Sequence, residues 1–110
     1  VRQKRRKLQD EYLKTIPFSD FSVFNSILKQ IPKRSMLQVG NSSAIRYTQL
    51  FKIPKSVEVF CNRGTSGIDG STSTAIGAAV ANEKQTTFIT GDLSFFYDSN
   101  AFWNYHLPSN

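Results

Sequence analysis

The stretch that decides the fold is MLQVGNSS at residues 36–43. It is a short apolar run that ends in glycine, asparagine and two serines, a pattern typical of a strand followed by a turn. Two further stretches, SVEVFC at residues 56–61 and QTTFIT at residues 85–90, carry β-branched and aromatic residues and also run into glycine-containing loops. The sequence therefore predicts three strands, each closed by a polar loop.

Helices are expected after each strand, at residues 44–51, 71–81 and 95–105. Strands that alternate with helices of about ten residues favour an α/β fold with a parallel sheet and right-handed crossovers. In open sheets of this kind, ligands bind beyond the carboxyl ends of the strands. We therefore expect the three loops that follow the strands to gather at one edge of the sheet and to form a binding site there.

Residues 1–34 are expected to form a helical lead-in segment of two helices. The first carries an apolar stripe that stops at Pro17: Leu8, Tyr12, Leu13 and Ile16. The second should begin at Ser19 or Asp20, either of which can cap a first turn, and end at Pro32. Core packing accounts for the aromatic residues of both helices, so no chemistry is assigned to them.

The composition fits one domain: 110 residues, of which 39% are hydrophobic. The longest apolar run, residues 75–81, is far short of the roughly 20 residues that cross a bilayer, so no membrane anchor is expected. Residues 8–11 are too polar to continue a secretory signal. The single cysteine, Cys61, excludes an internal disulfide and fits a reducing, cytoplasmic compartment. Because the chain starts at Val1, we expect a piece of a longer polypeptide.

The positive charge is concentrated at the start of the chain. Residues 1–7 hold five of the fourteen cations and no acid, so without them the net charge of +6 falls to +1. The preferred interpretation is the solvated end of a helix. The alternative is an arm for nucleic-acid binding or localisation, although the segment lacks interleaved aromatic residues and a recognised reader motif.

The first two loops contain candidate ligand-binding residues. In residues 40–46, the amides of a helix that begins near Ser42, together with the guanidinium of Arg46, can bind a carboxylate. The alternative is an ordinary serine cap beside a surface arginine. Residues 61–70 contain three glycines, which permit either a close approach of backbone to ligand or tight turns, and they match neither the Rossmann nor the P-loop motif.

The third loop, GDLS at residues 91–94, can hold a cation and a diphosphate together. Magnesium is commonly bound by one or two carboxylates and by phosphate oxygens. Asp92 would be the metal ligand, Gly91 would let the backbone turn, and the amides of Leu93 and Ser94 would face the phosphates. Helix capping by Asp92 is the alternative interpretation.

In combination, these loops resemble one enzyme family. The matching residues are GNS at 40–42 with Arg46, NRGTSGIDG at 62–70, and GDLS at 91–94 with Asp98 and Asn100. They resemble the cofactor-binding domain of the 2-succinyl-5-enolpyruvyl-6-hydroxy-3-cyclohexene-1-carboxylate synthases, the thiamine-diphosphate enzymes of menaquinone biosynthesis. The similarity covers about residues 35–102, and residues 35–110 would be the N-terminal part of that domain.

The resemblance implies a transferase that decarboxylates 2-oxoglutarate and adds the resulting carbanion to isochorismate. Thiamine diphosphate and Mg²⁺ or Mn²⁺ are the implied cofactors, and a homodimer or homotetramer is the implied assembly. Asp92 would bind the metal. The other implied cofactor-binding residues are Gly64, Ile68, Gly91, Leu93 and Ser94, with Ile68 propping the cofactor in a bent conformation. The implied substrate-binding residues are Ser42, Arg46 and Arg63.

The family's remaining metal ligands would follow Asn110, and its activating glutamate comes from another subunit. We therefore expect half a site, no catalytic residue in this chain, and no turnover by the chain alone. His106 is interpreted as a surface residue, and Cys61 as a small packed residue rather than a nucleophile. Two rival hypotheses remain, a non-catalytic α/β ligand-binding domain and a basic nucleic-acid-binding module, although our preferred reading includes no nucleic-acid partner.

Overall fold

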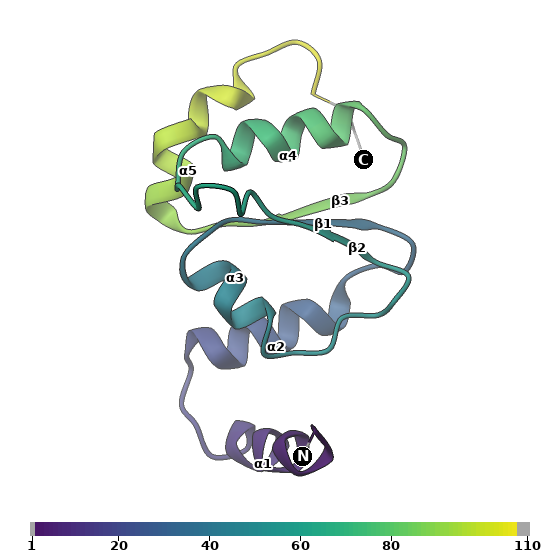
Figure 1. The fold of residues 1–110 in the computed structure, drawn as a ribbon, viewed down its shortest axis with the longest axis vertical. Coiled ribbons are helices and arrows are strands. Elements are labelled where there is room, and N and C mark those ends of the chain that lie inside the picture. Colours follow the sequence, from purple (N-terminus) through teal and green to yellow (C-terminus); the bar gives the residue numbers. More distant parts are fainter. Residues whose placement is uncertain (1, 108–110) are drawn as a thin grey trace.

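The computed structural model describes residues 2–107 and places a three-stranded sheet between two layers of helices (Figure 1). The strands are β1 (Met36–Val39), β2 (Glu58–Phe60) and β3 (Thr86–Ile89). The helices are α1 (Arg2–Leu13), α2 (Asp20–Gln30), α3 (Ser43–Thr48), α4 (Ser71–Val80) and α5 (Asp92–Asp98), followed by the 3₁₀ helix η1 (Ser99–Phe102). None of the helices within residues 2–107 is long and apolar enough to cross a membrane.

The sheet has the order β2-β1-β3, and both pairings are parallel. In the register, Leu37 lies between Val59 of β2 and Thr87 of β3. All four residues of β1 are buried, whereas those of β2 are exposed, as expected for a central strand and an edge strand. The predicted α/β fold with a three-stranded parallel sheet is confirmed.

The two faces of β1 pack against different helices. Leu37 and Val39 belong to the main core, which lies on the side of α2 and α3 (Figure 1). The other members of this core are Leu28, Ile31, Ala44, Ile45 and Val57. On the opposite side of the sheet lies α4, whose Ala75 and Ala79 are buried. Small residues at these positions let the helix approach the strands closely.

Strand β2 and helix α3 are shorter than predicted. The strand expected over residues 56–61 begins only at Glu58, because the amide of Val57 donates to the carbonyl of Pro54 (3.0 Å) in a preceding turn. The helix expected over residues 44–51 ends at Thr48. The Gln49 amide still bonds four positions back to Ile45, but the amides of Leu50 and Phe51 bond to carbonyls only three positions back, which ends the α-helical pattern.

The first and last helices also differ from expectation. Helix α1 ends at Leu13 rather than at Pro17, since the Thr15 amide turns back to the carbonyl of Tyr12 (3.0 Å). The predicted apolar stripe is only partly used, because Leu8 and Tyr12 remain more than half exposed. The helix expected over residues 95–105 begins at Asp92 instead.

Helix α2 begins at Asp20, with Ser19 as its N-cap, as predicted. Its aromatic residues connect the first three helices. Phe24 stacks on Tyr47 of α3, with ring centroids 5.2 Å apart, and Phe21 contacts Tyr12 of α1 at 5.7 Å. Core packing is therefore the role that the structure gives to these aromatic side chains.

Replacing Leu37 by alanine should destabilise the fold strongly. Its side chain is fully buried at the centre of the sheet, so Leu37→Ala leaves a cavity and should lower the free energy of unfolding by about 3 kcal/mol. Urea denaturation measures the change. The control, Leu8→Ala at an exposed position of α1, should alter stability by less than about 0.5 kcal/mol. Equal effects of the two variants would contradict this description of the core.

Candidate functional site

The carboxyl ends of the three parallel strands bring residues 40–46, 61–70 and 91–94 to one edge of the sheet, as predicted. At this edge β1 and β3 approach closely. The amide of Gly40 donates to the carbonyl of Ile89 (2.7 Å). A Cβ atom on Gly40 would lie 2.9 Å from Thr90 Oγ1 and 3.2 Å from Thr90 Cα, so the approach requires glycine.

Asn41 joins the first loop to the second. Its side chain is buried (2% exposed), and its Nδ2 donates to the carbonyls of Asn62 (2.6 Å) and Gly67 (2.7 Å). Its Oδ1 accepts from Arg63 Nη1 (3.1 Å) and from Cys61 Sγ (3.4 Å). These four bonds use both donors and both acceptor positions of the amide. One side chain therefore holds the beginning, middle and end of the turn at residues 61–67.

Asn41 was not among the predicted site residues, although it lies inside the matching GNS segment. Its signal is an amide residue two positions after the end of a buried strand. Only an amide offers two donors and an acceptor together, which suits a side chain that must connect two neighbouring loops.

The first loop forms a small cavity at the start of α3. Ser42 has φ 64° and ψ −129°, a backbone conformation that favours glycine, and α3 begins at the next residue. Ser42 and Arg46 line a cavity of about 360 Å³ together with Ser43, Tyr47 and Leu50. The structure thus brings two of the three predicted substrate-binding residues together. Arg63 does not line this cavity; its hydrogen bond ties it to Asn41, the residue that precedes Ser42.

The second and third loops are joined through Ser94. Its hydroxyl donates to the carbonyl of Ile68 (2.5 Å), and the side chain is buried. Ile68, predicted to prop the cofactor, is half-buried beside this bond. Because the hydroxyl is used inside the chain, only the backbone amide of Ser94 is left for the predicted contact with a diphosphate.

Asp92 is the first residue of α5, with Gly91 as the N-cap. Its side chain is exposed and has no hydrogen-bond or ion-pair partner within the described part of the chain. Helix capping by Asp92, the alternative interpretation, is therefore not what the structure shows. The amides of Asp92, Leu93 and Ser94 precede the first intrahelical bond of α5, which runs from Phe95 N to Gly91 O (3.0 Å).

Asp92 is the one carboxylate among the predicted cofactor- and substrate-binding residues, and Asp69 is a second exposed acid in the loop at residues 61–70. Across residues 2–107, no three histidine, cysteine, aspartate or glutamate side chains are grouped closely enough to hold a metal ion. A cation at Asp92 would therefore take its other ligands from a bound anion, from water or from residues outside the described chain.

Asp98, at the end of α5, binds the first turn of α4. Its carboxylate accepts from the backbone amide (2.6 Å) and the hydroxyl (2.5 Å) of Ser73, in the first turn of α4. A carboxylate is favourable at the positive end of a helix. This contact fixes α5 against α4, whose start follows the Gly67–Gly70 segment of the second loop. The sequence comparison included Asp98 in the motif but assigned it no role.

Cys61 is half-buried where β2 ends. Burial raises the pKa of its thiol, and the guanidinium of Arg63 lowers it by a smaller amount. A thiol with a raised pKa is a poor nucleophile at neutral pH. This agrees with the interpretation of Cys61 as a packed residue.

The reactivity of Cys61 should report the position of Arg63. Because burial raises the thiol pKa, alkylation by iodoacetamide should be slower near neutral pH than that of a free cysteine and should accelerate only at higher pH. Arg63→Gln removes the cation that lowers this pKa, so the pH profile of alkylation should move upward. The control is Arg34→Gln, in the turn before β1, which should leave the profile unchanged. A downward shift in Arg63→Gln would contradict the geometry.

No family model matches the chain. Several curated relatives that it matches share one description, 2-succinyl-5-enolpyruvyl-6-hydroxy-3-cyclohexene-1-carboxylate synthase. The protein from Flavobacterium psychrophilum is 63% identical over 110 residues, which is 100% of this chain and 20% of the relative. The protein from Flavobacterium johnsoniae is 61% identical over 96% of this chain, and that from Bacteroides fragilis is 54% identical over 86%.

The chain spans about one fifth of the length of these relatives. The aligned region of the Flavobacterium psychrophilum protein covers all three loops at the sheet edge. By this similarity, the chain belongs to the family of 2-succinyl-5-enolpyruvyl-6-hydroxy-3-cyclohexene-1-carboxylate synthases.

Proposed function

We propose that the full-length protein containing this chain is a thiamine-diphosphate-dependent transferase of menaquinone biosynthesis. It would release carbon dioxide from 2-oxoglutarate and join the remaining carbon unit to isochorismate. The single observation that carries the proposal is the sheet edge itself. This edge carries the Asp92 carboxylate, which has no partner in the described chain, and the free amides of α5, and Arg46 lines a cavity along the neighbouring α3; the chain is 63% identical to a relative with the synthase name.

The residues at the third loop fit a metal-bound diphosphate. The Asp92 carboxylate is exposed and without a partner in the described chain, so it is available as a ligand for Mg²⁺ or Mn²⁺. The amides of Leu93 and Ser94 are free to donate to phosphate oxygens. A Cβ atom on Gly64 or Gly91 would meet nothing within 4 Å, so the space beside both backbones is open.

Thiamine diphosphate, when bound, supplies the electron-accepting ring that decarboxylation of a 2-oxo acid requires. The contribution of this chain is positioning. Ser94 fixes the carbonyl of Ile68, and thereby fixes the apolar side chain that would contact the cofactor. Asp98 keeps the start of α4, and with it the end of the second loop, in place.

The proposed substrates are both dicarboxylates, which suits the two arginines. Arg46 lines the cavity with Ser42, where its planar guanidinium can bind a carboxylate through two parallel hydrogen bonds. Arg63 gives one N–H group to Asn41, which leaves its other donors for a ligand. Asn41 therefore orients one proposed substrate-binding residue while it holds the loop that carries it.

Removing the Asp92 carboxylate should abolish activity. An assay of the full-length protein would follow isochorismate consumption with 2-oxoglutarate, thiamine diphosphate and Mg²⁺. Mutation of a residue that hydrogen-bonds to a metal ligand typically lowers activity by about 10- to 100-fold. Asp92→Ala removes the proposed ligand itself, so it should lower activity by at least about 100-fold. The control is Glu83→Gln, an exposed acid that follows α4, away from this edge, and it should be fully active.

Three outcomes of this assay separate the claims. Activity that requires all four additions and is lost in Asp92→Ala supports the proposal. Full activity in Asp92→Ala would contradict the metal assignment but not the reaction. A folded wild-type protein that does not bind thiamine diphosphate would overturn the proposed function.

Arg46→Gln should weaken substrate binding without removing the cofactor. Loss of a charge-assisted pair to a carboxylate should raise KM for one substrate by about tenfold or more. The affinity for thiamine diphosphate, measured by titration calorimetry, should stay the same. Arg46→Lys should restore only part of the loss, because an ammonium cannot form the bidentate pair. Unchanged KM values for both substrates in Arg46→Gln would contradict this role.

A further inference from the structure

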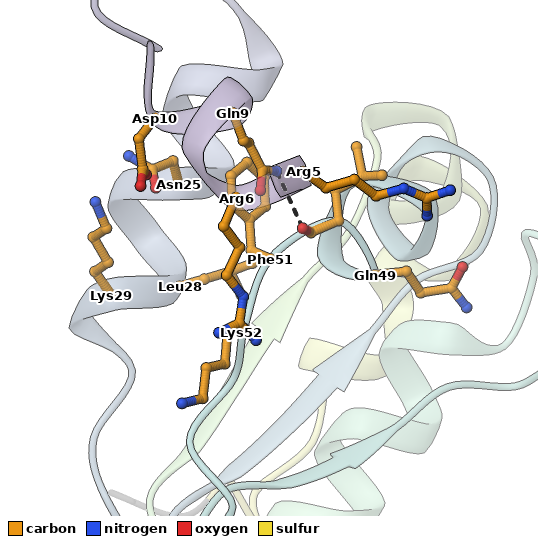
Figure 2. Close-up of a pocket in the computed structure, with 11 residues that line it drawn as sticks. Arg5, Arg6, Gln9, Asp10, Asn25, Leu28, Lys29, Gln49, Phe51 and Lys52 are labelled. Carbon is orange, nitrogen blue, oxygen red and sulfur yellow. Dashed lines mark hydrogen bonds between the residues drawn. The ribbon is translucent and has the colours of Figure 1, made fainter. Parts of the chain in front are cut away.

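A second pocket, of about 480 Å³, lies between α1, α2 and the segment that follows α3 (Figure 2). It is distinct from the cavity at Ser42, although Leu50 lines both. The side-chain amide of Gln9 donates to the carbonyl of Leu50 (3.1 Å) and fastens α1 to this wall of the pocket. Its volume falls within the range of small-molecule sites, about 300–1,000 Å³.

The lining of this pocket has an excess of positive charge. Four cations, Arg5, Arg6, Lys29 and Lys52, face one carboxylate, Asp10. None of the four cations forms an ion pair within the described residues, where Lys84 and Glu58 form one on the surface. Like charges gathered around one cavity repel each other, and a bound anion relieves that repulsion.

The directions of the side chains show where an anion would lie. Figure 2 shows Arg6 extending from α1 toward Lys52, beside Leu28 and Phe51. Lys29 extends toward Asp10 instead, and Arg5 extends in the direction of α3. Arg6 and Lys52 are therefore the two cations of the lining that lie away from Asp10 in this view.

The base of the pocket is apolar. Leu28 belongs to the buried core (2% exposed), and Phe51 packs against the same core. Leu28 is already covered, so the apolar surface open to a ligand is that of the partly exposed Phe51. A free inorganic ion would use the cations alone, whereas an organic anion would also cover Phe51 with its apolar part while its oxygens bind the guanidinium of Arg6.

We propose that this pocket binds a small organic phosphate, with the phosphate group between Arg6 and Lys52 and the apolar part against Phe51. The basic start of the chain is then part of a binding site rather than only a solvated helix end. The site is separate from Asp92, and the proposal does not depend on the proposed function.

The test is a calorimetric titration of the full-length protein with phenyl phosphate, with one equivalent of thiamine diphosphate per subunit and Mg²⁺, so that a site at Asp92 is filled without free thiamine diphosphate competing for the pocket. Saturable binding is expected. Arg6→Gln and Lys52→Gln should each weaken it by about tenfold, because each removes a charge-assisted contact. The matched control is Lys14→Gln, an exposed lysine just after α1 that does not line the pocket, and it should bind normally. Thermal unfolding of each variant verifies that it folds.

Two further measurements make the result decisive. Inorganic phosphate should bind at least tenfold more weakly than phenyl phosphate, and Asp92→Ala should bind phenyl phosphate as the wild type does. Absence of saturable binding, equal binding by the folded Arg6→Gln and Lys52→Gln variants, or equal binding of inorganic phosphate would overturn the proposal. So would salt-sensitive binding of an RNA oligonucleotide that depends on Arg6 while phenyl phosphate does not bind.

Discussion

The buried amide of Asn41 is the interaction on which the candidate site depends. Parallel pairing brings the ends of the strands to one edge, but it does not set the shape of the loops beyond them. The four hydrogen bonds of Asn41 do so for residues 61–67, and they fix the guanidinium of Arg63 at the same time. Because buried polar groups are costly unless they are satisfied, this fully used amide strongly favours one loop conformation.

The remaining loops are held by contacts of the same kind, each from a side chain to a distant backbone group. Ser94 binds the carbonyl of Ile68, and Asp98 binds the amide of Ser73. These bonds do not involve the Asp92 carboxylate or Arg46, which lines the cavity at Ser42. The loops are therefore held in place while the proposed ligand-binding groups stay available. Preorganisation of this kind lowers the entropic cost of binding.

The fold could be predicted from sequence because its signals are local. Strand β1 was predicted with its observed bounds, since a four-residue apolar run ends at a glycine. Strand β2 begins later than predicted because the turn at Pro54 uses the amide of Val57. Helix α5 begins earlier than predicted because Gly91 acts as its N-cap. The roles of Asn41 and Asp98, and the presence of Arg6 and Lys52 in one pocket, could not be predicted, because each depends on residues brought together only by the folded chain.

The most direct test of the account is hydrogen exchange in the full-length protein, measured by mass spectrometry with and without thiamine diphosphate and Mg²⁺. Residues 40–46, 61–70 and 91–95 should gain protection together, because one ligand would bind an edge to which all three loops contribute. Residues 20–30 in α2 serve as an internal reference and should not change. Protection of none of the three loops, or of the third loop alone, would contradict the claim that the parallel sheet assembles a single cofactor site.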